Sequence, residues 1–239
     1  MTALVLQARL DSSRLPQKAL LHLGELPLIF QVMRALSFIP CGTNILACPH
    51  DSVAAFSPLA EEAGFTVVAG PKEDVLARFC IALRQCGAEK IIRATGDNPF
   101  VFADAAAALH HEVLALQADA GSRRDTIDYA AYTGLPYGAG VELVSAEALL
   151  RAERETQDAS HREHVCPYLY NNGERFRLHR PPAPLRWQGA DLRITVDTAE
   201  DYQRAQILYE RLSTLPVKEQ NKGENVIAAY KQCFPEGGE

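Results

Sequence analysis

Short apolar runs alternate with amphipathic segments along most of this 239-residue chain. The segments repeat apolar residues every three or four positions, which is typical of helices that cover a core. The runs, expected as strands, are residues 3–6, 44–48, 65–68, 90–93, 126–130, 175–178 and 192–196. The expected helices are residues 28–38, 52–63, 74–86, 105–117, 146–154, 162–171 and 199–212. Strands that are apolar throughout are buried on both faces, beneath helices. The pattern therefore predicts a three-layer α/β/α fold around a mostly parallel, mixed sheet.

The composition favours one large domain. With 47% hydrophobic residues, a chain of this length can bury a sizeable core. The formal net charge of −6 argues against general nucleic-acid binding, which normally requires a basic domain. The sequence has no apolar run long enough to cross a bilayer and no leader-like start. We therefore expect a cytoplasmic protein that binds neither nucleic acid nor membrane.

The six cysteines are scattered and form no C-x-x-C pair. Zinc sites and disulfide frameworks follow spacing rules that this chain does not satisfy. We expect most of them to be reduced thiols that serve as small core residues.

Three cations follow the first expected strand. Arg9, Arg14 and Lys18 lie on the loop where an α/β sheet usually opens its ligand crevice. In a chain of negative net charge, such a concentration of cations indicates one specific anionic ligand. Small residues on the same loop, namely Ala8, Ser12 and Ser13, let backbone N–H groups approach a phosphate. The loop suits a triphosphate, although a solvated basic loop would have the same composition.

Two aspartates directly follow expected strands. Asp97 comes after Gly96 at the end of the run over residues 90–93, and Asp197 comes after the run over residues 192–196. Mg²⁺ binds through one or two carboxylates together with substrate phosphates. Asp97 and Asp197 can share such an ion if their strands are neighbours. Each aspartate also has a structural alternative, because Asp97 can make an Asx turn and the run after Asp197 can cap a helix through Thr198.

Four ordered motifs resemble the cytidylyltransferase family related to the spore coat polysaccharide biosynthesis protein SpsF, and more distantly the CMP-ketodeoxyoctonate and CMP-sialic acid synthetases. The motifs are Q-A-R-x-x-S-x-R-L-P-x-K at 7–18, E-D-V-L-x-R at 73–78, R-x-T-G-D-N-P at 93–99 and V-D-T-x-E-D at 196–201, and R-E-H-V at 162–165 is a weaker fifth. The resemblance implies a nucleotide-diphosphosugar transferase-like fold, CTP as the nucleotide and a homodimer.

The resemblance also implies roles for individual residues. Arg9, Lys18 and Asp97 would be catalytic, and Asp97 and Asp197 would hold Mg²⁺. Nucleotide-binding residues would be Gln7, Ala8, Arg9, Ser12, Ser13, Arg14, Lys18, Arg78, Thr95 and Gly96, with Arg78 near the base. The resemblance places Arg162 and His164 near the acceptor. Apart from the resemblance, Gly138 and Gly140 precede Glu142 in a glycine-rich loop that can approach an acceptor, so Gly140 and Glu142 are also expected to bind it. Asp11 and Gln17 stand where family members usually have glycine. Asp11 should weaken phosphate binding unless it faces solvent or pairs with Arg14.

We expect a single domain over residues 1–239. Residues 1–125 would mainly bind the nucleotide, 126–190 would bind the acceptor and form the dimer, and 191–239 would supply a closing strand and C-terminal helices. The predicted reaction is Mg²⁺-dependent transfer of CMP from CTP to a sugar, sugar-phosphate or sugar-acid acceptor, with release of pyrophosphate, in the synthesis of surface glycan precursors. The alternatives are a nucleotide-sugar-dependent glycosyltransferase of the same fold and a non-catalytic nucleotide-binding protein.

Overall fold

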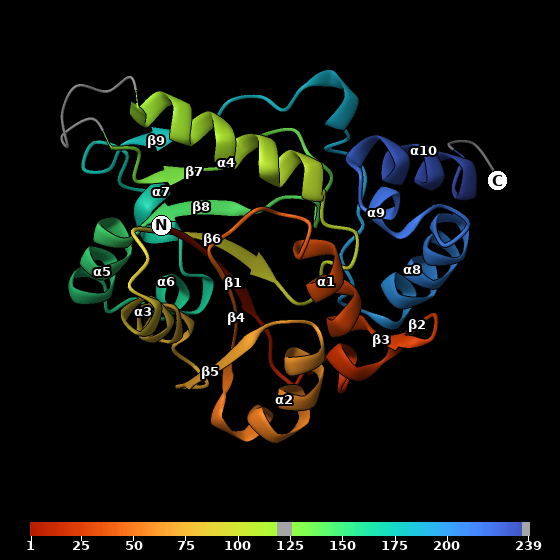
Figure 1. Ribbon diagram of the computed structural model, residues 1–239, viewed down its shortest axis with the longest axis horizontal. Helices are drawn as coiled ribbons and strands as arrows, with labels where there is room; N and C mark the ends of the chain where they lie inside the picture. Colours follow the sequence, from red (N-terminus) through yellow and green to blue (C-terminus); the bar gives the residue numbers. More distant parts are fainter. Residues whose placement is uncertain (119–125, 236–239) are drawn as a thin grey trace.

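The computed structural model describes residues 1–118 and 126–235, and a seven-stranded sheet lies at its centre (Figure 1). The strands are arranged in the order β5-β4-β1-β6-β8-β7-β9. Their bounds are β1 Thr2–Gln7, β4 Thr43–Pro49, β5 Thr66–Gly70, β6 Lys90–Thr95, β7 Tyr129–Ala130, β8 Glu142–Ser145 and β9 Leu178–His179. β5, β4, β1 and β6 are parallel, whereas β8 runs antiparallel to both β6 and β7. The predicted mixed, mostly parallel sheet is confirmed.

Helices cover both faces of this sheet, which gives three layers (Figure 1). They are α1 Leu28–Leu36, α2 Val53–Glu62, α3 Val75–Cys86, α4 Ala103–Ala118, α5 Ala146–Glu155, α6 Ala159–His164, α7 Pro167–Tyr170, α8 Ala199–Leu212, α9 Val217–Gln220 and α10 Gly223–Cys233. Successive residues of a strand point to opposite faces. Ala3 and Val5 of β1 therefore belong to the core formed with α3, α5 and α7, whereas Leu4 and Leu6 belong to the core formed with α1, α2 and α4.

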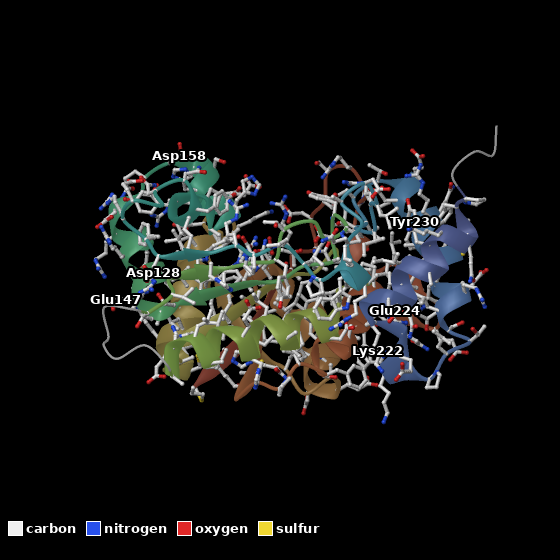
Figure 2. All side chains as sticks on the ribbon, turned by 90° about the horizontal axis from the view of Figure 1, so that it is seen from above. Asp128, Glu147, Asp158, Lys222, Glu224 and Tyr230 are labelled. Carbon is white, nitrogen blue, oxygen red and sulfur yellow. The ribbon has the colours of Figure 1, made fainter. Side chains whose placement is uncertain are left out.

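The C-terminal helices α8, α9 and α10 gather at one end of the molecule, next to the short antiparallel pair β2 (His22–Leu23) and β3 (Leu26–Pro27) (Figure 1). Figure 2 shows the two ends: Asp158, which precedes α6, lies at one, and Tyr230 of α10 lies at the other. C-terminal helices were expected within residues 191–239, but the sequence patterns gave no bounds for α9 and α10 and did not predict the β2–β3 pair. No helix in the described part of the chain is both long and apolar enough to span a bilayer.

The prediction of a strand over residues 192–196 is wrong. Leu192, Ile194 and Val196 are buried, as alternate residues of a strand would be. Their backbone groups, however, bond to loops. Tyr137 N donates to the Leu192 carbonyl at 2.8 Å, Ile194 N donates to the Tyr137 carbonyl at 2.9 Å, and Val196 N donates to the Asp97 carbonyl at 2.8 Å. The alternating apolar residues of 192–196 therefore reflect the burial of an irregular segment and not of a strand.

Three other expected elements differ in their bounds. The expected helix over 162–171 is two helices, α6 and α7, because Val165 interrupts it with a φ of 72° and Pro167 begins the second. β7 covers only the last two residues of the run over 126–130, and β9 starts at the last residue of the run over 175–178. β8, at the centre of the antiparallel part, was not predicted.

Candidate active site

A cleft of about 470 Å³ opens where β1 and β6 end. Most of the predicted site residues line it, namely Gln7, Ala8, Arg9, Ser12, Ser13, Arg14, Lys18, Arg78, Thr95, Gly96, Asp97, His164 and Asp197. Gly140, Glu142 and Arg162 are not among the residues of its wall. The cleft therefore brings together side chains from both ends of the sequence.

Lys18 lies between the two predicted metal ligands. Its Nζ atom donates to Asp97 Oδ2 at 3.2 Å, to Asp197 Oδ1 at 3.0 Å and to the Val196 carbonyl at 2.8 Å. Only 16% of the Lys18 side chain is exposed, and only 11% of the Asp197 side chain. The ammonium group thus holds together two carboxylates that are 100 positions apart in the sequence numbering, Asp97 and Asp197.

Gly96 sets the direction of the turn that carries Asp97. Its N–H donates to the Gln7 carbonyl at 2.8 Å, which keeps the end of β6 against the end of β1. A Cβ atom at this position would lie 3.0 Å from that carbonyl oxygen and 2.9 Å from Ile29 Cδ1. Because a side chain does not fit there, the chain passes close to β1 and brings Asp97 to the cleft.

The segment before α8 positions Asp197 without forming a strand. Gly138 has a φ of 97°, and a Cβ atom on it would lie 2.7 Å from Thr195 N, so this close backbone approach requires glycine. Val196 N and the Thr195 hydroxyl both donate to the Asp97 carbonyl, at 2.8 and 3.3 Å. The main chains that carry the two aspartates are therefore bonded directly to each other.

The expected helix cap is also present, and it involves a different aspartate. Thr198 and Asp201 form a reciprocal capping box at the start of α8. Because Asp201 caps the helix, the carboxylate of Asp197 is free to form ion pairs with three cations. These are Arg14 at 3.1 Å, Lys18 at 3.0 Å and Arg193 at 2.7 Å. Burial acts to raise the pKa of Asp197, but the hydrogen bond and charge of Lys18, together with Arg14 and Arg193, hold it below 3.8.

The carboxylate of Asp201 makes the stability of the folded state depend on pH. It accepts from Arg193 Nε at 3.1 Å and from the N–H groups of Asp197 and Thr198 at 3.0 and 3.1 Å. Burial acts to raise its pKa, yet these donors hold the pKa below the ordinary 3.8. A carboxylate with a depressed pKa stabilises the folded state above its unfolded-state pKa, and this contribution disappears as the pH falls through the folded-state value.

The Asp201→Asn variant should therefore be less stable than the wild-type chain near neutral pH, and the difference should shrink in acid. Urea unfolding at about pH 7 and about pH 3 measures this difference in the free energy of unfolding. A difference that stays the same at both pH values would contradict the prediction.

The structure shows how Gln17 and Asp11, both expected to stand in place of glycine, are accommodated. Gln17 has a φ of 52°, in the left-handed region that glycine enters freely and other residues enter at a cost of roughly 1–2 kcal/mol. Asp11 pairs with Lys72 at 2.6 Å, and this hydrogen bond lowers the pKa of Asp11. Asp11 is therefore neutralised by Lys72, whereas Arg14 bonds to Asp197.

Arg78 and Arg162 are both anchored, and only Arg78 reaches the cleft. Arg78 is 1% exposed and donates from Nη1 to the carbonyls of Pro71 and Lys72 at 2.6 and 2.7 Å. Its buried Nε has no hydrogen-bond partner in the described part of the chain, and burial lowers its pKa. Arg162 donates to Asp74 at 2.7 Å and to the carbonyls of Glu153 and Thr156. Arg162 thereby ties α6 to the N-cap of α3.

Glu142 lies behind the cleft wall. Its carboxylate forms an ion pair with Arg93 and accepts from the Tyr129 hydroxyl at 2.8 Å. Arg93 lines the cleft and donates from Nε to Gln7 Oε1 at 3.1 Å. Sequence reasoning did not select Arg93, although its place two residues before Thr95 in β6 put both side chains on one face of the strand.

His164 and Glu163 reach the cleft from α6. Val165 follows with a φ of 72°, and Cys166 N donates to the His164 carbonyl at 2.9 Å, which closes a tight γ-turn. Gly140 lies away from the cleft, near Ala105 and Leu109 of α4, where the space is too small to hold a water molecule. Glu163 is a further lining residue that the sequence analysis did not select.

The donor set fits a cation that arrives with its own oxygen ligands. The described residues contain no group of three or more histidine, cysteine, aspartate or glutamate side chains placed to hold a metal ion. Asp97 and Asp197 provide two carboxylates, which is the number that Mg²⁺ commonly takes from protein when phosphates complete its shell. All six cysteines are free thiols, but only Cys48, Cys80 and Cys166 are the buried core residues that were expected, because the other three are partly exposed.

Comparisons with known proteins agree with this arrangement. A family model described as cytidylyltransferase matches residues 3–236. The spore coat polysaccharide biosynthesis protein SpsF of Bacillus subtilis is 30% identical over 219 residues, which covers 89% of this chain and 88% of that protein. A solved cytidylyltransferase of Leptospira borgpetersenii superposes with a TM-score of 0.84 at 22% identity, over 97% of this chain and 94% of that one.

A CMP:2-keto-3-deoxy-manno-octonic acid synthetase, solved in complex with CTP, shares the fold with a TM-score of 0.65 at 18% identity, over 90% of this chain and 99% of that one. The expected fold is thus confirmed by the sheet topology and by solved structures. The chain belongs to the cytidylyltransferase family and is a nucleotidyltransferase.

Proposed function

We propose that this protein transfers CMP from CTP to a sugar, sugar-phosphate or sugar-acid acceptor and releases pyrophosphate, with Mg²⁺ as its cofactor. The observation that carries the proposal is the convergence of Lys18, Asp97 and Asp197 in one cleft that Arg9 and Arg14 also line. The relative named for spore coat polysaccharide biosynthesis supports a role in the synthesis of surface glycan precursors.

The cationic side chains bind and orient the triphosphate. Arg9, Arg14 and Lys18 lie on the loop after β1 and reduce the repulsion between the phosphates and an attacking oxygen. An ionised phosphate oxygen of the acceptor, or a hydroxyl oxygen that gives its proton to water, forms a bond to the α-phosphorus. The bond from that phosphorus to the bridging oxygen breaks, and pyrophosphate leaves with the electron pair. Because such transfer depends mainly on positioning and charge neutralisation, the site needs no strong general base.

Asp97 and Asp197 would hold Mg²⁺ through their carboxylate oxygens. When bound, the ion supplies positive charge to the phosphates. Gln7, Ala8, Ser12, Ser13, Thr95 and Gly96 would contact the nucleotide, and the anchored Arg78 would lie near the base. This division assigns the nucleotide mainly to residues 1–125.

The acceptor would bind mainly to residues 126–190. His164 is in the cleft wall, so it would contact the acceptor directly. Glu142 would act through its ion pair with Arg93, and Arg162 would act by holding α6 against α3. Gly140 would shape the loop before β8. We further propose that the protein forms a homodimer through this same region.

Release of pyrophosphate tests the proposal. The protein is incubated with CTP and Mg²⁺ and, in separate reactions, with sugar phosphates, alditol phosphates and eight- or nine-carbon keto acids. We expect pyrophosphate only when both CTP and one acceptor class are present, and less with other nucleoside triphosphates. Consumption of a nucleotide sugar instead would identify a glycosyltransferase. CTP binding by calorimetry without product for any acceptor would indicate a non-catalytic protein.

A further inference from the structure

We propose that Lys18 makes the binding of the divalent cation and the binding of the triphosphate depend on each other. The ammonium group occupies the aspartate oxygens that a cation would use, and it releases them when phosphate oxygens are available as new partners. This inference rests on the proposed function, because it takes Asp97 and Asp197 as the cation ligands.

The hydrogen bonds of Lys18 use its full donor capacity. An ammonium group has three protons, and Nζ has three acceptors: Asp97 Oδ2, Asp197 Oδ1 and the Val196 carbonyl. The lysine therefore has no donor left for a phosphate unless it gives up one of these contacts. A phosphate contact made by Lys18 must replace one of these three, and two of the three are contacts to the aspartates.

The same contacts obstruct a lone cation. Asp197 Oδ1 is shared by Lys18 and Arg14, and Asp197 Oδ2 is 2.7 Å from Arg193. Asp97 Oδ2 is also taken by Lys18. A cation that approaches the inner oxygens of both carboxylates must displace Lys18 and enter beside Arg14.

The charges of the site also oppose the binding of a cation without the triphosphate. Asp97, Asp197 and Asp201 face three cations, Lys18, Arg14 and Arg193, so the charges of this cluster are already balanced. A divalent ion alone would give the cluster an excess of positive charge in a partly buried site, where repulsion is only weakly screened. A triphosphate brings enough negative charge to reverse the excess, and its oxygens give Lys18 new acceptors within the same cleft.

Coupling between two ligands is reciprocal. If the triphosphate raises the affinity for the cation by drawing Lys18 away, the cation must raise the affinity for the triphosphate by the same factor. The cation and CTP should therefore bind strongly together and weakly apart, beyond the attraction that they have for each other in solution.

The Lys18→Met variant tests this coupling because it removes the charge and keeps most of the aliphatic stem. Binding of Mn²⁺ alone is followed by electron paramagnetic resonance, and CTP affinity is measured by calorimetry with Mg²⁺ and with a chelator. We expect the variant to bind Mn²⁺ alone about tenfold more tightly than wild type, and Mg²⁺ to increase its CTP affinity about tenfold less. Lys222→Met, which removes an exposed lysine paired with Glu219, is the matched control and should behave as wild type.

The outcomes separate this inference from the proposed function. Suppose that wild type binds Mn²⁺ with CTP, that Asp197→Asn loses this binding, and that Lys18→Met matches wild type in both measurements. Those results would overturn the proposal that Lys18 exchanges aspartate oxygens for phosphate oxygens, and would still support the metal site at Asp97 and Asp197. If the wild-type protein binds no Mn²⁺ even with CTP, both the exchange and the proposed cofactor are overturned. Lys18→Arg, which keeps a cation, should retain the weak binding of Mn²⁺ alone.

Discussion

The Asp197→Asn variant is expected to turn over CTP about 10²–10³-fold more slowly than wild type, the loss typical of removing one preorganised electrostatic group from an active site. The substitution keeps the size of the side chain but removes the charge that three cations share. Lys18, Arg14 and Arg193 would then lose their common carboxylate, so both the placement of Lys18 and the proposed cation site would suffer. Steady-state release of pyrophosphate measures the effect.

Asp191→Asn provides the control, since Asp191 is an exposed aspartate on the same irregular segment. Its turnover should stay within about twofold of wild type, in keeping with an exposed substitution. Circular dichroism checks that both variants are folded. A folded Asp197→Asn variant that retains nearly full turnover would refute the assigned role of this carboxylate.

The Trp187→Ala variant should lose about 3–5 kcal/mol of unfolding free energy, the range observed for truncating a large buried aromatic residue. Trp187 is 2% exposed, and its indole N–H donates to Asp104 Oδ2 at 3.0 Å. Gly223, at the start of α10, is so close that a Cβ atom on it would lie 2.6 Å from the indole ring. Removing the ring would leave a cavity where α4 and α10 meet.

Thermal unfolding measures this loss, and the melting temperature should fall by about 10 °C for a chain of this size. Leu185 offers a matched control because it belongs to the same short helical turn and is 86% exposed. Leu185→Ala should change the stability by about 0.5 kcal/mol or less. Equal losses in the two variants would show that the turn contributes through its backbone and that the indole does not.

Sequence patterns predicted the parts of the site that depend on the parallel strands. Arg9 and Lys18 follow β1, and Asp97 follows β6, so their meeting at one edge of the sheet follows from the rule that the carboxyl ends of parallel strands share that edge. Asp197 was correctly predicted to lie at this edge of the sheet, but the reason given, that it follows a strand over residues 192–196, is wrong. Its segment is not a strand, and its backbone bonds go to Tyr137 and Asp97.

Contacts between distant side chains could not be predicted. The partner of Asp11 is Lys72, on the loop after β5, and a local motif carries no information about such a pair. Glu142 appeared as a candidate acceptor ligand because it follows a glycine-rich loop. Its ion pair with Arg93 depends on the antiparallel placement of β8 beside β6, and β8 is too short to stand out from the surrounding loop. Roles of Gly140, Glu142, Arg162 and His164 in acceptor binding remain predictions.

The hydrogen bond from Val196 N to the Asp97 carbonyl joins main-chain atoms. Such a bond does not itself use any side chain, so apart from Gly96 and Gly138, where a side chain does not fit, mutations can accumulate around it while the spacing of the two acidic groups stays fixed. Enzymes built in this way can diverge far in sequence and still present one unchanged pair of oxygen donors. Substrate preference is then free to evolve on the surrounding loops.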